Sequence, residues 1–150
     1  MLYTTGQLRN AFQLSKQQWR SYRDALPPLG KAKGRASCFS TADLLAVSVA
    51  RQISQTLSIP LSALTAVAEP LFEVCGSTPW PQLERSSLLI DLEHQRIVVV
   101  EYDHTDLLLS IAILVSLAPL VTELREHLLA DAADPQRDLA FPPMIARGRR

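Results

Sequence analysis

The sequence predicts a mainly α-helical fold with a small β component, in which short amino-terminal helices are followed by a β-hairpin and a long apolar helix. Three observations support this fold class. In the first half, Ser or Thr stands three positions before Gln or Asp at three places, which is the spacing of a helix-capping box. Residues 87–102 contain a partly alternating segment and then a β-branched run, which predicts two paired strands. The segment that follows is apolar on nearly every side, which predicts a buried helix.

Length and charge define what these elements can belong to. With 150 residues, of which 47% are hydrophobic and 20% charged, the chain can bury a core as one domain or two small ones. The net charge is zero, but residues 1–35 hold seven Lys and Arg against the single acid Asp24. The rest of the chain is therefore negative. This asymmetry favours a polyanionic partner for the amino-terminal part.

Several classes of protein are not indicated. The two cysteines, Cys38 and Cys75, are far apart and give neither a disulfide framework nor a metal-ligand spacing. The first ten residues lack the apolar region of a signal peptide, and the longest apolar run, residues 107–121, is shorter than the roughly 20 residues that span a bilayer. The three histidines are scattered, and there is no phosphate-binding glycine loop or nucleophile elbow. We therefore expect a cytoplasmic protein that is not an enzyme, with no cofactor, metal or membrane span.

Two short helices are expected at the start of the chain. Thr4 and Gln7 have capping-box spacing, and apolar residues at helical intervals after them predict a first helix of about two turns. Ser15 and Gln18 repeat the signal after a turn of two or three residues, and a Pro-Pro pair stops the second helix near Ala25. A helix-turn-helix this tight lays one helix across the other.

The second helix has a cationic outer side. Trp19 and Tyr22 fall near one side. Lys16, Gln17, Arg20 and Arg23 point mainly outward, and this cationic and amide-bearing set suits phosphate oxygens and base edges in a DNA major groove. The alternative is an ordinary amphipathic helix with a solvated basic face. The residues of this helix expected to bind DNA are Lys16, Gln17, Gln18, Arg20, Tyr22 and Arg23, with Tyr22 also packing inward.

A basic loop follows at residues 30–35, with the sequence GKAKGR. Its two glycines and three cations predict an exposed hairpin tip or wing. Lys31, Lys33 and Arg35 would then touch the phosphate backbone beside the groove. The alternative is an exposed basic loop without a partner.

Two further helices are expected before the middle of the chain. Ser40 and Asp43 form the third capping signature, and the apolar spacing continues to Leu57 in a helix that is mostly core. Pro60 suits the first turn of a fourth helix, whereas Pro70 is expected to end or kink it.

The order of several motifs resembles a known family. The motifs are YTTGQL at residues 3–8, LS at 14–15, WRSYR at 19–23, LPP at 26–28, FS at 39–40 and DL at 43–44. Together they resemble the winged helix-turn-helix of MerR-type transcriptional regulators over roughly residues 3–70. The resemblance implies that Arg20 and Tyr22 contact DNA and that Lys31, Lys33 and Arg35 lie on the wing.

The second half departs from that family. We expect a DNA-binding domain over residues 1–74, a linker over 75–84, a dimerisation region over 85–130 and a disordered or loosely packed tail over 131–150. The dimerisation region would consist of the hairpin and a helix from Leu107 to about Ala130, bent at Pro119. An all-round apolar helix needs more cover than one hairpin gives, which favours a second copy of the chain, although a monomer wrapped by its own winged domain is the alternative. The expected interface residues are Leu107, Leu108, Ile111, Leu114, Val115 and Leu117.

These features predict a homodimeric, sequence-specific regulator of bacterial or phage type that binds double-stranded DNA. The alternative is a protein-interaction module, such as a phage packaging or excision factor, that uses the winged domain for docking. A small-molecule effector bound between hairpin and helix is compatible with the first hypothesis but is not indicated by any motif.

Overall fold

The amino-terminal part of the fold begins with a short strand and two short helices. The computed structural model of the chain describes residues 2–31, 38–101 and 111–132. Strand β1 (Leu2–Thr4) leads into α1 (Thr5–Ala11), and α2 (Lys16–Ala25) is followed by the 3₁₀ helix η1 (Pro27–Gly30). Both capping boxes are present, so the predicted starts of α1 and α2 are confirmed. In the first, the Gln7 N–H donates to Thr4 Oγ1 (3.3 Å) and the Thr4 N–H donates to Gln7 Oε1 (2.9 Å).

A second short strand joins the first and introduces the central helix. Strand β2 (Cys38–Ser40) pairs antiparallel with β1, with Phe39 opposite Tyr3, and both of these side chains are buried. Helix α3 (Thr41–Leu57) starts at the predicted third capping box, in which the Ser40 N–H donates to Asp43 Oδ2 (2.8 Å). Every residue of α3 from Leu44 to Ala50 is buried, so this helix forms the centre of the core.

Helix α4 does not end at Pro70, which was one of the two outcomes expected for this proline. After the 3₁₀ helix η2 (Leu61–Leu64), α4 (Thr65–Ser77) continues through Pro70 instead of ending there. The proline removes one backbone hydrogen bond from the helix. On both sides of it, however, the helix buries apolar side chains in the core, which offsets that loss. These side chains are Val67, Ala68, Leu71 and Cys75.

The linker expected at residues 75–84 is mostly helical. Helix α4 extends to Ser77, and α5 (Trp80–Glu84) begins directly after Pro79. Prolines are tolerated here because the N–H groups of a first helical turn have no partner within the helix. Leu83 is fully buried, and apolar residues from both halves of the chain form one core cluster.

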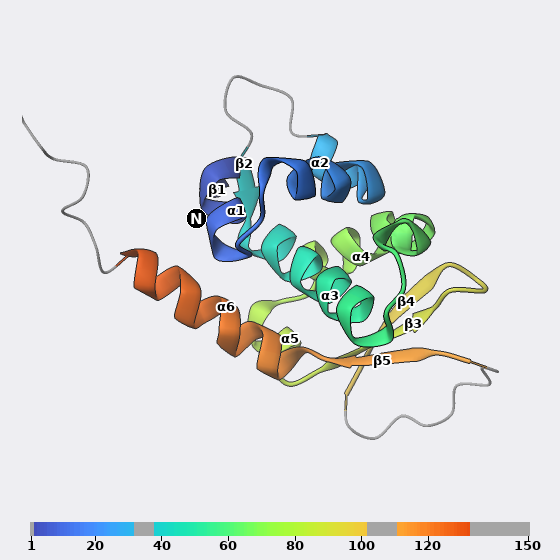
Figure 1. The fold of residues 1–150 in the computed structure, drawn as a ribbon. Coiled ribbons are helices and arrows are strands. Elements are labelled where there is room, and N and C mark those ends of the chain that lie inside the picture. The colour runs from blue at the N-terminus through green and yellow to red at the C-terminus, as the bar shows by residue number, and fades with distance from the viewer. Residues whose placement is uncertain (1, 32–37, 102–110, 133–150) are drawn as a thin grey trace, which may run out of the picture.

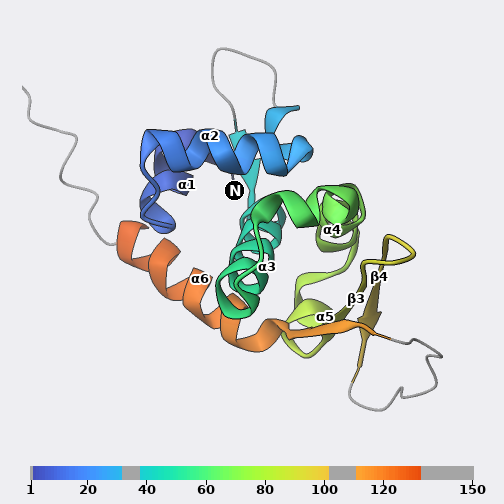
Figure 2. The ribbon, with the colours of Figure 1, turned by 45° about the vertical axis from the view of Figure 1, so that its right-hand side comes forward.

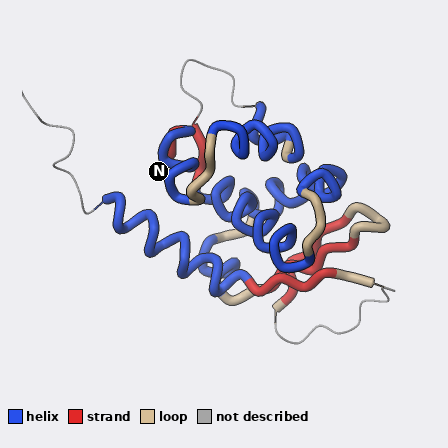
Figure 3. The backbone as a smooth tube through the Cα atoms, in the orientation of Figure 1, coloured by secondary structure: helices blue, strands red, loops and turns tan. Residues whose placement is uncertain are grey.

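The predicted hairpin is present and belongs to a three-stranded sheet. Strands β3 (Ser87–Asp91) and β4 (Arg96–Val100) pair antiparallel, and β5 (Ile113–Ser116) pairs with the other edge of β3. Leu88 and Ile90 face the core together with their partners on both neighbouring strands. These three strands lie at one end of the molecule, away from the β1–β2 pair (Figure 3).

The long helix expected from Leu107 to about Ala130 is wrong in its first part. Residues 113–116 form β5, and α6 (Leu117–Ala132) begins only at Leu117. Pro119 is the third residue of α6, where its missing N–H costs nothing, so it does not bend a longer helix. A short apolar run next to a hairpin edge can complete a sheet as well as continue a helix, and periodicity alone does not separate the two. Leu107 and Leu108 lie outside the described residues, as does the tail expected over residues 131–150, except for its first two residues, which end α6.

The arrangement leaves α2 on the surface. Helix α3 runs through the centre, with α6 along one side and the three-stranded sheet next to the start of α6, while α2 lies along the opposite face (Figures 1 and 2). Within the described residues no helix is both long and apolar enough to cross a bilayer.

Candidate nucleic-acid interface

The rotation of α2 is fixed by its buried side. Trp19, Tyr22 and Ala25 are each less than one-tenth exposed. The Trp19 ring meets the Phe39 ring edge-on, with centroids 5.7 Å apart and planes at 80°. Because these three residues cover one side of the helix, the opposite side must face solvent.

Both ends of α2 are anchored. At its start, the Gln18 N–H donates to Ser15 Oγ (3.1 Å) and the Ser15 N–H donates to Gln18 Oε1 (2.8 Å). At its end, Thr65 Oγ1 donates to the Ala25 carbonyl (2.8 Å), which ties the last turn to the first residue of α4. The helix is therefore held at a fixed position on the core.

The turn between α1 and α2 is closed by hydrogen bonds of its own. The Leu14 N–H donates to the Arg9 carbonyl (2.8 Å), and Arg9 Nε donates to the Leu14 carbonyl (3.3 Å). Gln13 occupies the left-handed region at φ 53°, which a residue other than glycine adopts only at an energetic cost. These contacts set the angle between the two helices.

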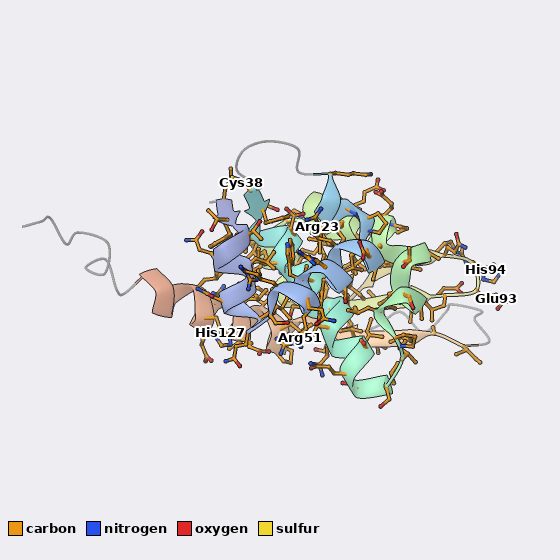
Figure 4. All side chains as sticks on the ribbon, turned by 45° about the horizontal axis from the view of Figure 1, so that its top comes forward. Arg23, Cys38, Arg51, Glu93, His94 and His127 are labelled. Carbon is orange, nitrogen blue, oxygen red and sulfur yellow. The ribbon has the colours of Figure 1, made fainter. Side chains whose placement is uncertain are left out.

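The outer side of α2 carries charged and polar side chains. Successive helical residues are about 100° apart, so Arg20 and Asp24 each point within about 20° of the direction opposite the buried set, and Gln17 within about 40°. Lys16 and Arg23 lie on one flank, and all five residues are exposed. Among the described residues, no acid lies within ion-pair distance of Lys16, Arg20 or Arg23. Figure 4, which looks onto α2, shows Arg23 well separated from Glu93 and His94 at the β3–β4 turn.

Two residues expected to bind DNA also contribute to the structure of α2 itself. Gln18 is exposed, but its side-chain oxygen accepts the Ser15 N–H as part of the helix cap. Tyr22 is buried, and burial raises the pKa of its hydroxyl, an effect that the nearby Arg51 partly offsets. The inward packing predicted for Tyr22 is present, and its contact with phosphate stays a prediction.

The first cation of the predicted wing is paired within the chain. Lys31 Nζ donates to the Glu69 carboxylate on α4, and both side chains are more than half exposed. Lys33 and Arg35 lie outside the described residues.

Arg51 on α3 was missed by the sequence analysis. Its guanidinium lies over the Phe12 ring, 5.8 Å from the centroid, and its charge reaches Tyr22. A single arginine in an otherwise apolar helical stretch was the available signal. It adds a half-buried positive charge beneath the turn that precedes α2.

The residues expected at a dimer interface fall into two groups. Val115 and Leu117 are buried in the core of their own chain, which rules out their direct participation in an interface.

The other two described residues lie at an exposed edge of the sheet, where Ile111 and Leu114 are 83% and 63% exposed. In the sheet register Leu89 lies between Val98 and Leu114, so these three side chains form an apolar row on the face turned away from the core. We call Val98, Leu89 and Leu114 the outer row.

A groove of about 380 Å³ lies between the end of α3, β5 and the start of α6. Ile53, Leu57 and Leu120 supply part of its apolar lining, and Gln52 and Glu123 add polar groups. The groove has the size of a small-ligand site, but nothing in its lining selects a chemical class. Within the described residues, no group of His, Cys, Asp and Glu side chains is arranged to hold a metal ion.

The β3–β4 turn contains a buried carboxylate. Asp91 is 3% exposed; its Oδ2 lies 2.7 Å from His94 Nδ1 and 3.5 Å from Arg96 Nη2, and its Oδ1 accepts the His94 N–H (3.1 Å). Burial raises the pKa of Asp91, but the hydrogen bonds from His94 and Arg96 outweigh it and hold the pKa below its ordinary value. These contacts join the end of β3 to the turn and to the start of β4.

Comparison with protein-family models, with curated proteins and with solved structures found no match to this chain.

Proposed function

We propose that this chain is a sequence-specific regulator that binds double-stranded DNA through α2, with α1, α2 and the β1–β2 pair acting as a winged helix-turn-helix. The observation that carries the proposal is the outer side of α2. It is exposed along its length, rigidly anchored at both ends, and carries Lys16, Arg20 and Arg23 free of ion pairs with other described residues. A capped helix of 10 residues with such a side fits the major groove.

Two further observations support this reading over a solvated basic face. Asp24 is the single acid among the first 35 residues, so positive charge gathers around α2 although the whole chain is neutral. The observed element order of strand, helix, helix, strand and core helix also agrees with the MerR-like motifs at residues 3–44. The MerR assignment itself remains part of the proposal.

The proposal includes a homodimer. One short helix reads few base pairs, and a two-fold pair would place two such helices about one turn of DNA apart. The outer row, together with the exposed Ile111, offers apolar area that no described element covers. The proposed interface is therefore the open face and edge of the sheet, and not the helix that the sequence predicted. The same apolar face would also serve a protein-interaction module, which is the second candidate.

The test is binding to duplex DNA at several salt concentrations, with wild type, Arg20→Ala and the control Arg85→Ala. Arg85 is exposed on the opposite half of the chain, and its 3.8 Å pair with Glu101 is a surface interaction. We expect Arg20→Ala to weaken binding to a selected sequence by roughly 1 to 3 kcal/mol, more than its binding to random duplex. If Arg20→Ala loses the same affinity for the selected sequence and for random duplex, Arg20 does not read bases. If its loss of affinity equals that of Arg85→Ala, α2 is not the DNA-binding surface.

A further inference from the structure

Asp24 is an acid on the outer side of α2, the side proposed to bind DNA, where a negative charge is unexpected. Asp24 stands one helical turn after Arg20, and these two residues point outward more directly than any other residue of α2. Its side chain is exposed, and no described cation lies within ion-pair distance of it. It therefore does not stabilise α2 by pairing with Arg20, although the spacing would allow it.

The position of Asp24 matches the spacing of base-reading residues. Helices in the major groove use positions that recur every three or four residues along one stripe. Gln17, Arg20 and Asp24 occupy such positions on α2. In the proposed complex a residue in this stripe faces base edges, whereas Lys16 and Arg23 on the flank face the phosphates.

A carboxylate in the groove has a narrow choice of partners. It only accepts hydrogen bonds, and the guanine and thymine edges present acceptors to it. Adenine offers an amino group, but its N7 acceptor lies beside it. The cytosine N4 amino group is the donor that a carboxylate reads best, whereas guanine and thymine leave the charge unpaired and repelled and adenine adds the repulsion of its N7.

On this basis, and resting on the proposed function, we propose that Asp24 is a specificity-determining residue that accepts a hydrogen bond from a cytosine N4 amino group. The rise between Arg20 and Asp24 is about 6 Å, so the cytosine lies one or two base pairs from the base that Arg20 reads. Asp24 thus lowers affinity for DNA in general and restores it only on sequences with cytosine at that position.

The experiment is selection of bound sequences from a random duplex pool at a fixed salt concentration, followed by binding assays on single-base variants. The proteins are wild type, Asp24→Asn and the matched control Glu93→Gln. The control also removes one negative charge, but from the exposed β3–β4 turn far from α2 (Figure 4). Both substitutions are on the surface, where changes rarely affect folding.

We expect wild type to select cytosine at one position with about tenfold discrimination, and Asp24→Asn to lose that preference while keeping the other positions. Asp24→Asn should also bind random duplex more tightly than wild type, and Glu93→Gln should behave as wild type. If Asp24→Asn binds all DNA more tightly with an unchanged selected sequence, Asp24 only repels phosphate and the inference is overturned. If wild type itself selects no sequence, the proposed function fails in the wild-type arm, and the inference falls with it.

Discussion

Lys31 and Glu69 form an ion pair between the first cation of the basic loop and the middle of α4. Both side chains are largely in solvent, with 66% and 57% of their area exposed. An ion pair of this kind contributes little to folding because water and salt screen it. In the proposed complex a phosphate group replaces the Glu69 carboxylate at the Lys31 ammonium, so the pair would compete with DNA for this cation.

The variant Glu69→Gln should therefore bind duplex DNA more tightly. The substitution frees Lys31 and removes a negative charge beside the proposed phosphate contact, and we expect a gain of about threefold at low salt. The free energy of unfolding should change by less than about 0.5 kcal/mol. Fluorescence anisotropy measures the change in affinity, and urea unfolding in parallel measures the change in the free energy of unfolding. Glu73→Gln, one turn along the exposed side of α4, is the control, and an equal gain in both variants would show a general charge effect.

The capping box at Ser15 gives a prediction about stability. Ser15→Ala leaves the Gln18 N–H without its side-chain acceptor at the start of α2. We expect the free energy of unfolding to fall by about 1 kcal/mol and the Tm by roughly 2 to 4 °C. Ser62→Ala is the control, because Ser62 is exposed in η2, a helix without a side-chain cap. Equal unfolding midpoints for the two variants would mean that the cap does not stabilise α2.

The helix starts in the first half of the fold were predictable because their signals are local, whereas the β1–β2 pair was not predicted. Capping boxes at Thr4, Ser15 and Ser40 specify helix starts through bonds between residues three positions apart, and all three were found in the structure. The hairpin was also predictable, since its turn separates two runs of β-type residues. The helix end predicted as one outcome at Pro70 is absent, because the burial of α4 in the core outweighs the local preference of the proline.

The second half depended on contacts that sequence patterns do not contain. The apolar residues around Leu114 became a strand because β3 has a second open edge, and only the pairing with Ile90 and its neighbours reveals this. The burial of Val115 and Leu117 follows from that pairing. Their apolar character alone could not show whether they lie in the core of the chain or at an interface between two chains. Arg51 was missed for the same reason, because its contact with Phe12 joins α3 to the α1–α2 turn.

Asp91 makes the stability of the hairpin turn dependent on pH. Because the folded pKa lies below the usual value for an aspartate, the carboxylate contributes stability above its unfolded pKa and loses that contribution as the pH falls through the folded pKa. Asp91→Asn should therefore lower stability at pH 7 and flatten the loss of stability below about pH 4. Urea midpoints measured at pH 7, 5 and 3 test this. Glu93→Gln in the same turn serves as the control, and an unchanged acid profile in Asp91→Asn would show that the contacts with His94 and Arg96 contribute nothing.

The outer row gives a prediction about assembly. Leu114 is 63% exposed in the middle of β5, an edge strand without charged residues, and edges of this kind favour pairing with another chain. Leu114→Glu places a charge in the proposed interface, so we expect wild type to have the mass of a dimer and this variant the mass of a monomer in light scattering. Because the variant keeps α2 intact, it should still bind a single DNA half-site while losing its preference for two half-sites one turn apart.

Leu2→Glu is the matched control for Leu114→Glu. Leu2 is similarly exposed, at 67%, but lies on β1 away from the sheet of β3, β4 and β5, so this variant should remain a dimer. A monomeric wild type would remove the homodimer from the proposal and leave single-site binding by α2. A wild type with the mass of a larger ring would instead favour the protein-interaction module, because a two-fold interface closes on itself at two copies.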